Sequence, residues 1–156
     1  EMKPITYTEC KKLTESVYNR IGANTGKNAI DVTLMIVAHE SGRGEHRRQI
    51  GADDPALGLG QMERATFNDT LKHSDRINSY LLRGGYCPKS VEFEQIGEDD
   101  ELALIFIRAR LAMDINPLPS GVIHQAVYCK EYWNAGGKAT PDKYLIDYIE
   151  WSRVTD

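Results

Sequence analysis

The sequence has little cysteine, no excess of basic residues and no long apolar run, and each absence excludes a class of protein. Its three cysteines, Cys10, Cys87 and Cys129, are odd in number and lack C-x-x-C spacing, so neither a disulfide framework nor a zinc ribbon is indicated. With 19 Lys and Arg against 23 Asp and Glu, the net charge of −4 argues against a dedicated nucleic-acid binder, which needs a basic surface. No apolar run is long enough to span a bilayer.

Composition and the N-terminal segment indicate an ordinary globular protein. The segment EMKPITYTECKK lacks the apolar core of a secretory signal, so we expect synthesis in a reducing cytoplasm without a signal peptide. One basic stretch, RGEHRRQ at residues 43–49, either faces a polyanion or is a solvated loop. A chain of 156 residues with 41% hydrophobic and 27% charged residues has the size and balance of one domain, which we expect over residues 1–156.

Apolar residues recur every three or four positions through most of the chain, which predicts a mainly helical fold. The expected helices are 6–21 with Thr6 as N-cap, 28–40 with Asn28 as N-cap, 64–73, 75–83, 99–113, 120–133 with Ser120 as N-cap, and one from Pro141 after the cap Thr140. The second is apolar on almost every face, so it should be the central buried helix, with Glu40 at its C-terminal end. Residues 41–62 are rich in Gly, Asp and Arg and predict loop or a very small β element.

Glu40 is the first candidate for chemistry. The spacing from His39-Glu40 to His46 does not fit the H-E-x-x-H metal motif, so we expect no metal, and nothing in the sequence indicates another cofactor. A carboxyl group at the end of a buried helix is partly desolvated, which raises its pKa and suits it to protonate the leaving oxygen of a sugar bond. An ion pair with Arg43 or Arg47 at a helix end explains the local pattern equally well.

Four motifs in order then suggest a family. Glu40-Ser41 is followed by Arg47-Arg48-Gln49, by PALGLGQMERAT at 55–66, by an Ala- and Ile-rich segment ending in PLP at 102–119, and by AVYCKEYWNAGGKAT at 126–140. Together they resemble the E-S … A-x-G-L-x-Q … T pattern of lysozyme-like lytic transglycosylases, a superfamily shared with goose-type lysozymes, and most closely its bacteriophage members. The resemblance spans residues 29–148 and implies an α+β lysozyme-like fold that is mainly α.

The resemblance also implies an activity and a site. The activity is cleavage of the β-1,4 bond between N-acetylmuramic acid and N-acetylglucosamine in peptidoglycan, with Glu40 as general acid and base. The Gln61 amide can pair with an N-acetyl group, and aromatic rings can stack on sugars, although core packing explains at least one of the rings. Relatives usually have Tyr directly before the motif's Asn, so the hydroxyl expected there is missing in this chain. The residues implied to bind substrate are Ser41, Leu59, Gln61, Met62, Tyr128, Tyr132, Trp133 and Asn134.

The sequence leaves open whether the reaction uses a second catalytic carboxylate. The transglycosylase route needs one carboxyl group and releases a 1,6-anhydro sugar, whereas a hydrolytic lysozyme needs a second group as nucleophile or base. Glu63 is the candidate, with helix capping or pairing with Arg64 as the alternative, while Asp53 and Asp54 fit a structural turn.

The resemblance finally implies a biological setting, a phage endolysin or a virion-associated lysin. Such a protein would act as a monomer on peptidoglycan glycan strands, reaching the wall through a holin-type pore or as part of a virion, without inserting into a membrane or binding nucleic acid. A catalytically inactive wall-binding or virion structural module on the same fold is the alternative.

Overall fold

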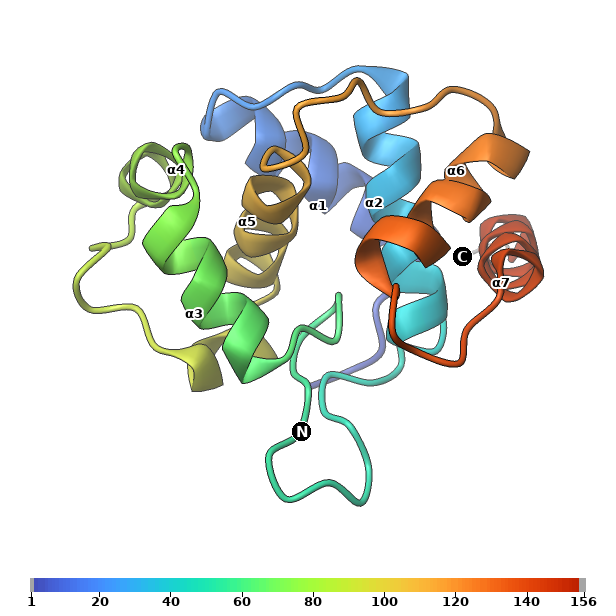
Figure 1. Cartoon of the computed structure of the whole chain (residues 1–156), viewed down its shortest axis with the longest axis horizontal. Helices are drawn as coiled ribbons and strands as arrows, with labels where there is room; N and C mark the ends of the chain where they lie inside the picture. Colours follow the sequence, from blue (N-terminus) through green and yellow to red (C-terminus); the bar gives the residue numbers. More distant parts are fainter. Residues whose placement is uncertain (1, 155–156) are drawn as a thin grey trace.

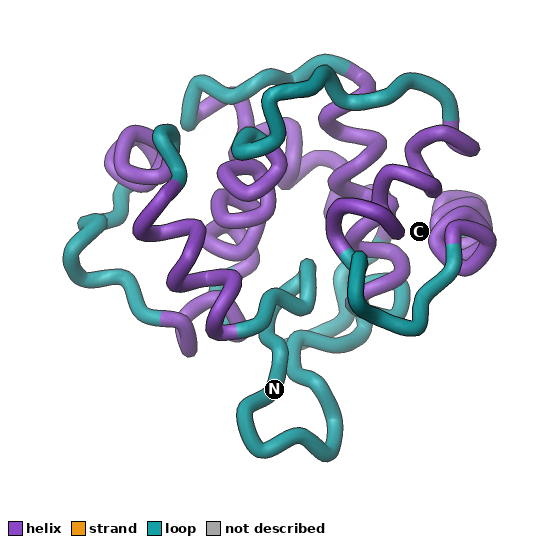
Figure 2. The backbone as a smooth tube through the Cα atoms, in the orientation of Figure 1, coloured by secondary structure: helices purple, strands orange, loops and turns teal. Residues whose placement is uncertain are grey.

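The computed structural model describes residues 2–154 and is built almost entirely from helices. Strand pairing within this range is limited to isolated bridges from Leu57 to Arg48 and to Met62, so the tube of Figure 2 shows helices and loops only. The prediction of a mainly helical fold, with at most a very small β element in 41–62, is therefore confirmed. The helices are α1 (Tyr7–Arg20), α2 (Lys27–Glu40), α3 (Arg64–His73), α4 (Ile77–Gly84), the 3₁₀ helix η1 (Phe93–Gly97), α5 (Asp100–Leu111), α6 (Val122–Tyr128), the π-helical turn η2 (Cys129–Trp133) and α7 (Pro141–Arg153).

The helix α2 is mostly buried and central, as its apolar sequence predicts. Its residues from Ala29 to Ala38 are all buried, and it contacts α1, α5, α6 and α7. The second apolar helix, α5, buries every residue from Leu102 to Ala109 and packs on α1, α3 and α4 as well. Figure 1 shows α2 and α5 through the middle of the molecule, with α3 and α4 on one side and α6 and α7 on the other. A helix can be apolar all round only in such a position.

Two predicted helix starts are confirmed by their capping contacts. The Thr6 side chain accepts a hydrogen bond from the Glu9 amide at 3.1 Å, and the Glu9 carboxylate accepts one from the Thr6 amide at 3.0 Å, which completes a capping box. The Thr140 hydroxyl accepts from the Lys143 amide at 3.3 Å, with Pro141 in the first turn of α7.

Two predicted caps are wrong. The first turn of α2 already begins at Lys27, after an extended Gly26 whose amide donates to the Asn24 side chain at 2.7 Å, so Asn28 lies inside the helix. For α6, the residue before the helix is Gly121 with φ of +85°, not Ser120. A left-handed turn of this kind costs glycine little, and it leaves Ser120 one residue too early to cap.

The segment between α2 and α3 positions the site. Its end, residues 57–62, is a tight turn closed by two hydrogen bonds between Leu57 and Met62, at 2.9 and 3.0 Å. In Figure 1 this turn reaches up between the α3 side and the α6 side of the molecule. None of the helices within residues 2–154 is long and apolar enough to cross a bilayer.

Candidate functional site

Glu40 lies at the edge of an open pocket of about 320 Å³, called here the main pocket. Three separate parts of the chain line it: the C-terminal residue of α2, the end of the tight turn with Glu63 after it, and the end of η2 with the loop that follows. The pocket therefore brings together residues that the sequence motifs proposed independently. The lining residues are Glu40, Gln61, Glu63, Trp133, Asn134, Ala135, Gly136 and Gly137.

The Glu40 carboxyl group is largely buried and is contacted by neutral donors. The Tyr144 hydroxyl donates a hydrogen bond to Glu40 Oε2, and Asn134 Nδ2 donates to the same oxygen at 3.3 Å. Burial raises the pKa of Glu40 above its ordinary value, while the Tyr144 hydrogen bond, the charge of His39 and the Asn134 hydrogen bond hold it down in part. Its place at the negative end of the α2 dipole also favours the neutral form. The net effect is a pKa above the ordinary value, which eases the return and donation of a proton by this carboxyl group.

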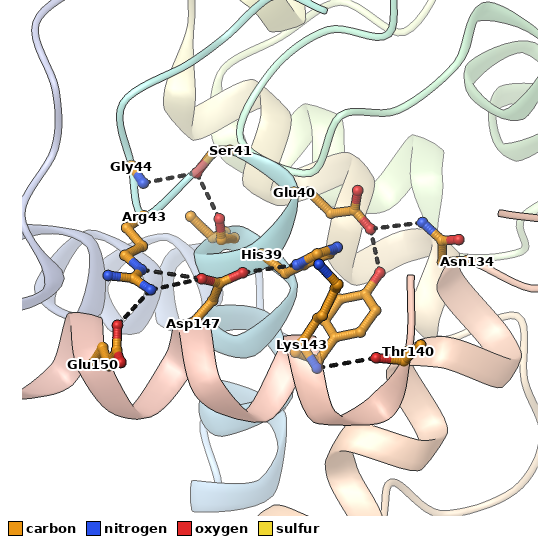
Figure 3. Close-up of polar contacts among 12 residues, drawn as sticks. His39, Glu40, Ser41, Arg43, Gly44, Asn134, Thr140, Lys143, Asp147 and Glu150 are labelled. Atoms are coloured by element: carbon orange, nitrogen blue, oxygen red, sulfur yellow. Dashed lines mark hydrogen bonds and ion pairs between the residues drawn. The ribbon is translucent and has the colours of Figure 1, made fainter. Parts of the chain in front are cut away.

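The alternative in which Glu40 is an ordinary ion-pair partner is wrong. Arg43 donates to Asp147 at 2.9 Å, and Arg47 makes a two-pronged contact with Asp100 at 2.7 and 2.9 Å. Figure 3 shows Arg43 turned toward Asp147, while Glu40 points the other way toward Asn134. Both arginines are thus engaged elsewhere, and the charge of Glu40 is left without a cationic partner among them.

Tyr144 is the site residue that sequence reasoning missed. It lies in the first turn of α7 without exposed surface, so the sequence around it indicates only a buried aromatic residue. Its ring is held against that of His39, with centroids 4.4 Å apart, and His39 Nδ1 in turn lies 2.8 Å from Asp147 Oδ2. Burial, and then the negative charge of Glu40, raise the pKa of Tyr144, so its hydroxyl stays protonated. Tyr144 is thereby fixed as a hydrogen-bond donor to Glu40.

The two glycines of the tight turn, Gly58 and Gly60, allow close packing against neighbouring elements. Gly58 has φ of +79°, and a Cβ atom there would lie 2.6 Å from the Ile96 carbonyl oxygen. A Cβ atom on Gly60 would lie 2.9 Å from the Ile107 side chain of α5. Gln61 follows with φ of +47°, in the left-handed region. Its side-chain Nε2 donates a hydrogen bond to the Gly58 carbonyl at 3.3 Å. The turn therefore holds Gln61 at the main pocket, as expected.

Two of the implied substrate contacts do not reach the pocket. Ser41 is buried, and its hydroxyl donates to the Val37 carbonyl at 2.6 Å and accepts from the Gly44 amide at 2.9 Å. Leu59 has no exposed surface because it packs in the core. Met62 is also almost fully buried, but it lines a small hollow beside the main pocket. Ser41 and Leu59 therefore shape the backbone around the site instead of binding a ligand through their side chains.

The three aromatic residues of the last motif lie along one line of hollows. Trp133 lines both the main pocket and the hollow beside it, and its Nε1 donates to the Gly60 carbonyl at 3.0 Å. Tyr132 lines that hollow and a groove of about 410 Å³ beyond it, and its hydroxyl donates to the Arg110 carbonyl. Tyr128 lines the groove and stacks on Tyr132, with ring centroids 5.3 Å apart and planes at 12°. Trp133 is thus close to Glu40, while the tyrosines extend the surface away from it.

A π-helical turn places the two residues nearest to Glu40 in this motif. The backbone N–H of Asn134 donates a hydrogen bond to the Cys129 carbonyl five residues earlier, at 3.1 Å. This spacing defines the wider, π-helical turn of η2. Asn134 and Trp133 both line the main pocket. Cys129 itself is fully buried, and burial raises the pKa of its thiol, so it packs as a small apolar residue.

Glu63 lies in the main pocket without the contacts that would explain it structurally. It occupies the N-cap position of α3, but its side chain makes no capping hydrogen bond. Arg64, the expected ion-pair partner, instead binds Asp54 at 3.1 Å and Glu94 at 3.0 Å. Asp54 thus forms an exposed ion pair with Arg64, and Glu63 is exposed in the same pocket as Glu40.

Comparisons with protein-family models, with curated proteins and with solved structures give no match to this chain. Within residues 2–154, no three His, Cys, Asp or Glu side chains are grouped so that they would hold a metal ion. The geometry of the main pocket and the sequence motifs therefore carry the functional argument.

Proposed function

We propose that this protein cleaves the glycan strands of bacterial peptidoglycan at the β-1,4 bond between N-acetylmuramic acid and N-acetylglucosamine. The observation that carries the proposal is the state of Glu40: a largely buried carboxyl group with a raised pKa, at an open pocket, contacted by the neutral donors Tyr144 and Asn134. Sugar-bond cleavage needs such a proton donor. The resemblance of the surrounding motifs to lysozyme-like lytic transglycosylases supports the same chemistry.

In the proposed reaction, Glu40 donates its proton to the glycosidic oxygen as the bond from that oxygen to the anomeric carbon breaks. The 6-hydroxyl group of the muramic acid then attacks the anomeric carbon and returns its proton to Glu40, which closes a 1,6-anhydro ring without consuming water. The acetamido oxygen of the substrate stabilises the positive charge that develops in between. Gln61 and Asn134 line the same pocket and offer amide groups to hold the sugar.

A hydrolytic route is the second candidate, and the position of Glu63 favours it. Glu63 lines the main pocket with Glu40 and has no capping contact. In this route a water molecule attacks the anomeric carbon and gives its proton to Glu63, so the product has a reducing end. The two routes differ by one water in the mass of the product.

Digestion of purified peptidoglycan, with muropeptides measured by mass spectrometry, tests the proposal. Wild-type protein is expected to release 1,6-anhydro muropeptides, and Glu40→Gln to release none. Glu63→Gln keeps activity in the transglycosylase route and loses it in the hydrolytic route. Glu45→Gln, at an exposed acid of the loop after α2, is the matched control and should behave as wild type.

Clearing of permeabilised bacterial cells measures the same activity on whole walls. If wild-type protein binds walls but neither clears cells nor releases muropeptides, the catalytic proposal is wrong and the inactive wall-binding module replaces it. Delivery to the wall, by a holin-type pore or within a virion, belongs to the same proposal and is tested separately by looking for the protein in purified particles.

A further inference from the structure

Arg108, in the last turn of α5, is a buried cation without a partner. Two arginines of the described chain are buried, Arg47 at 6% exposure and Arg108 at 9%. Arg47 is paired with Asp100, whereas no carboxylate of residues 2–154 forms an ion pair with Arg108. The Nε atom of Arg108 is buried with no hydrogen-bond partner, and the group facing its guanidinium is the Tyr18 ring, with its centroid 5.9 Å away. Buried charges are normally paired, so this one calls for a counter-charge.

Arg108 lines a cavity of about 300 Å³ whose other lining residues include three asparagines. Asn24, Asn28 and Asn116 line it together with Arg108. The Asn24 side-chain oxygen already accepts from the Gly26 amide, so its NH₂ group is the part left to donate. These residues come from the loop before α2, the first turn of α2, the last turn of α5 and the loop after α5.

The cavity also lies at the N-terminal turn of α2. Asn28 and Ala29 belong to that turn, and the N-cap residue Gly26 offers no side chain to satisfy its free N–H groups. The positive end of the α2 dipole is at this turn, which adds to the positive potential at the cavity. The start of α2 and the buried Arg108 line the same cavity, and both favour a negative charge in it.

Two features of the chain compensate Arg108 in part. The carbonyl end of α5 carries about half a negative charge, and Arg108 lies in its last turn. Asp114 also lines the cavity, but its Oδ1 accepts both the backbone and the side-chain N–H groups of Asn116, each at 3.0 Å. Neither the carbonyl end of α5 nor Asp114 forms a hydrogen bond with the Arg108 guanidinium.

We propose that this cavity binds a small oxyanion of the phosphate or carboxylate type. The guanidinium fork matches two oxygens of such an ion, and the asparagine amides supply further donors. The site is distinct from the main pocket, because Asn28 and Glu40 are twelve residues apart along α2, or about 18 Å at 1.5 Å per residue. A bound oxyanion would join the start of α2, the end of α5 and the loop that follows α5.

Thermal melting with added inorganic phosphate tests the site, with sodium acetate as the carboxylate probe and sodium chloride at equal ionic strength as reference. A ligand that binds only the folded state raises the melting temperature progressively with its concentration. We expect phosphate or acetate to raise the melting temperature above that in sodium chloride. The salt that gives the larger increase identifies the type of ion that binds. Equal melting in all three salts would overturn the proposal, since Arg108 would then be satisfied by water alone.

The location is tested by NMR and by variants. The side-chain NH₂ signals of Asn24, Asn28 and Asn116 should shift with phosphate, while that of the exposed Asn68 in α3 should not. Arg108→Gln should abolish the response, and Arg153→Gln, at an exposed arginine of α7, should keep it.

A second variant keeps the test decisive if Arg108→Gln does not fold. Asn28→Asp places a carboxylate in the first turn of α2, where a negative charge is favourable. It should raise the melting temperature without any added ion and lose the response to phosphate. A response that persists in Asn28→Asp, with shifts at Asn68 as large as those at Asn24, would place the ion elsewhere and reject the cavity as its site.

Discussion

Replacement of Glu40 by glutamine should remove activity and at the same time stabilise the fold at neutral pH. Glutamine keeps the volume and can still accept from Tyr144 and Asn134, but it cannot transfer a proton. General acid catalysis typically contributes a factor of about 10² to 10⁴, so the rate of wall cleavage should fall by at least about 100-fold. Removing a buried charge that only neutral donors satisfy should add on the order of 1 kcal/mol to the free energy of unfolding.

The stability gain should depend on pH in a defined direction. Burial raises the pKa of Glu40 in the folded state, so the folded protein binds this proton more tightly than the unfolded chain does. The stabilising effect of the proton is complete below the unfolded pKa, at roughly 4.3, and is lost as the pH rises through the folded pKa. Wild type and variant should therefore melt alike in acid, and the variant should melt about 2 to 4 °C higher at neutral pH.

Melting curves from acid to neutral pH, with cleavage measured on the same samples, check both effects. The matched control is Glu63→Gln, because Glu63 is exposed in the same pocket and its replacement should change stability by less than about 0.5 kcal/mol. A wild type that is more stable than the Glu40 variant at neutral pH would refute the reasoning, because it would mean that the ionised carboxylate is well satisfied. A difference that does not vary with pH would refute it as well.

Three further outcomes follow from single contacts. Trp133→Phe should lose about 1 kcal/mol of stability in urea unfolding and cleave more slowly, since it removes one hydrogen bond between the pocket walls; unchanged cleavage would show that the bond does not position the site. Arg47→Met should cost about 3 kcal/mol in the same assay by leaving the partly buried Asp100 unpaired, and a loss below 1 kcal/mol would contradict that pairing. Tyr144→Phe should move the alkaline limb of the pH–activity profile to higher pH, because the hydrogen bond that holds down the pKa of Glu40 is gone; an unmoved limb would show that the hydroxyl does not act on Glu40.

The sequence predicts the helices well because their signals are local. The caps at Thr6 and Thr140 lie within three residues of the amides they satisfy, so composition and spacing locate them. The errors at Asn28 and Ser120 are also local, because Gly26 and Gly121 take the positions before α2 and α6 and place those starts one or two residues away. Such shifts depend on backbone dihedrals that residue type alone does not determine.

The contacts of the site are harder to predict, because they join distant parts of the chain. Tyr144 reaches Glu40 across 104 positions, and its hydrophobic periodicity indicates only that it is buried. Ser41 and Leu59 stand in motifs that match a family of glycan-cleaving enzymes, yet a motif does not separate residues that touch a ligand from those that shape the backbone. Glu63 is the opposite case, since proximity to Gln61 in the sequence was enough to place it in the pocket.

The π-helical turn before Asn134 has an evolutionary consequence. A turn with hydrogen bonds five residues apart holds one more residue than an α-helical turn of the same kind, so it is equivalent to a single-residue insertion in a helix. Deleting one residue between Cys129 and Trp133 would restore regular α-helix and rotate all that follows by about 100° relative to α6. The indole would leave the Gly60 carbonyl, and the Asn134 side chain would leave Glu40. Lineages of this protein that keep the pocket are therefore under selection to keep the length of this segment as well as its residues.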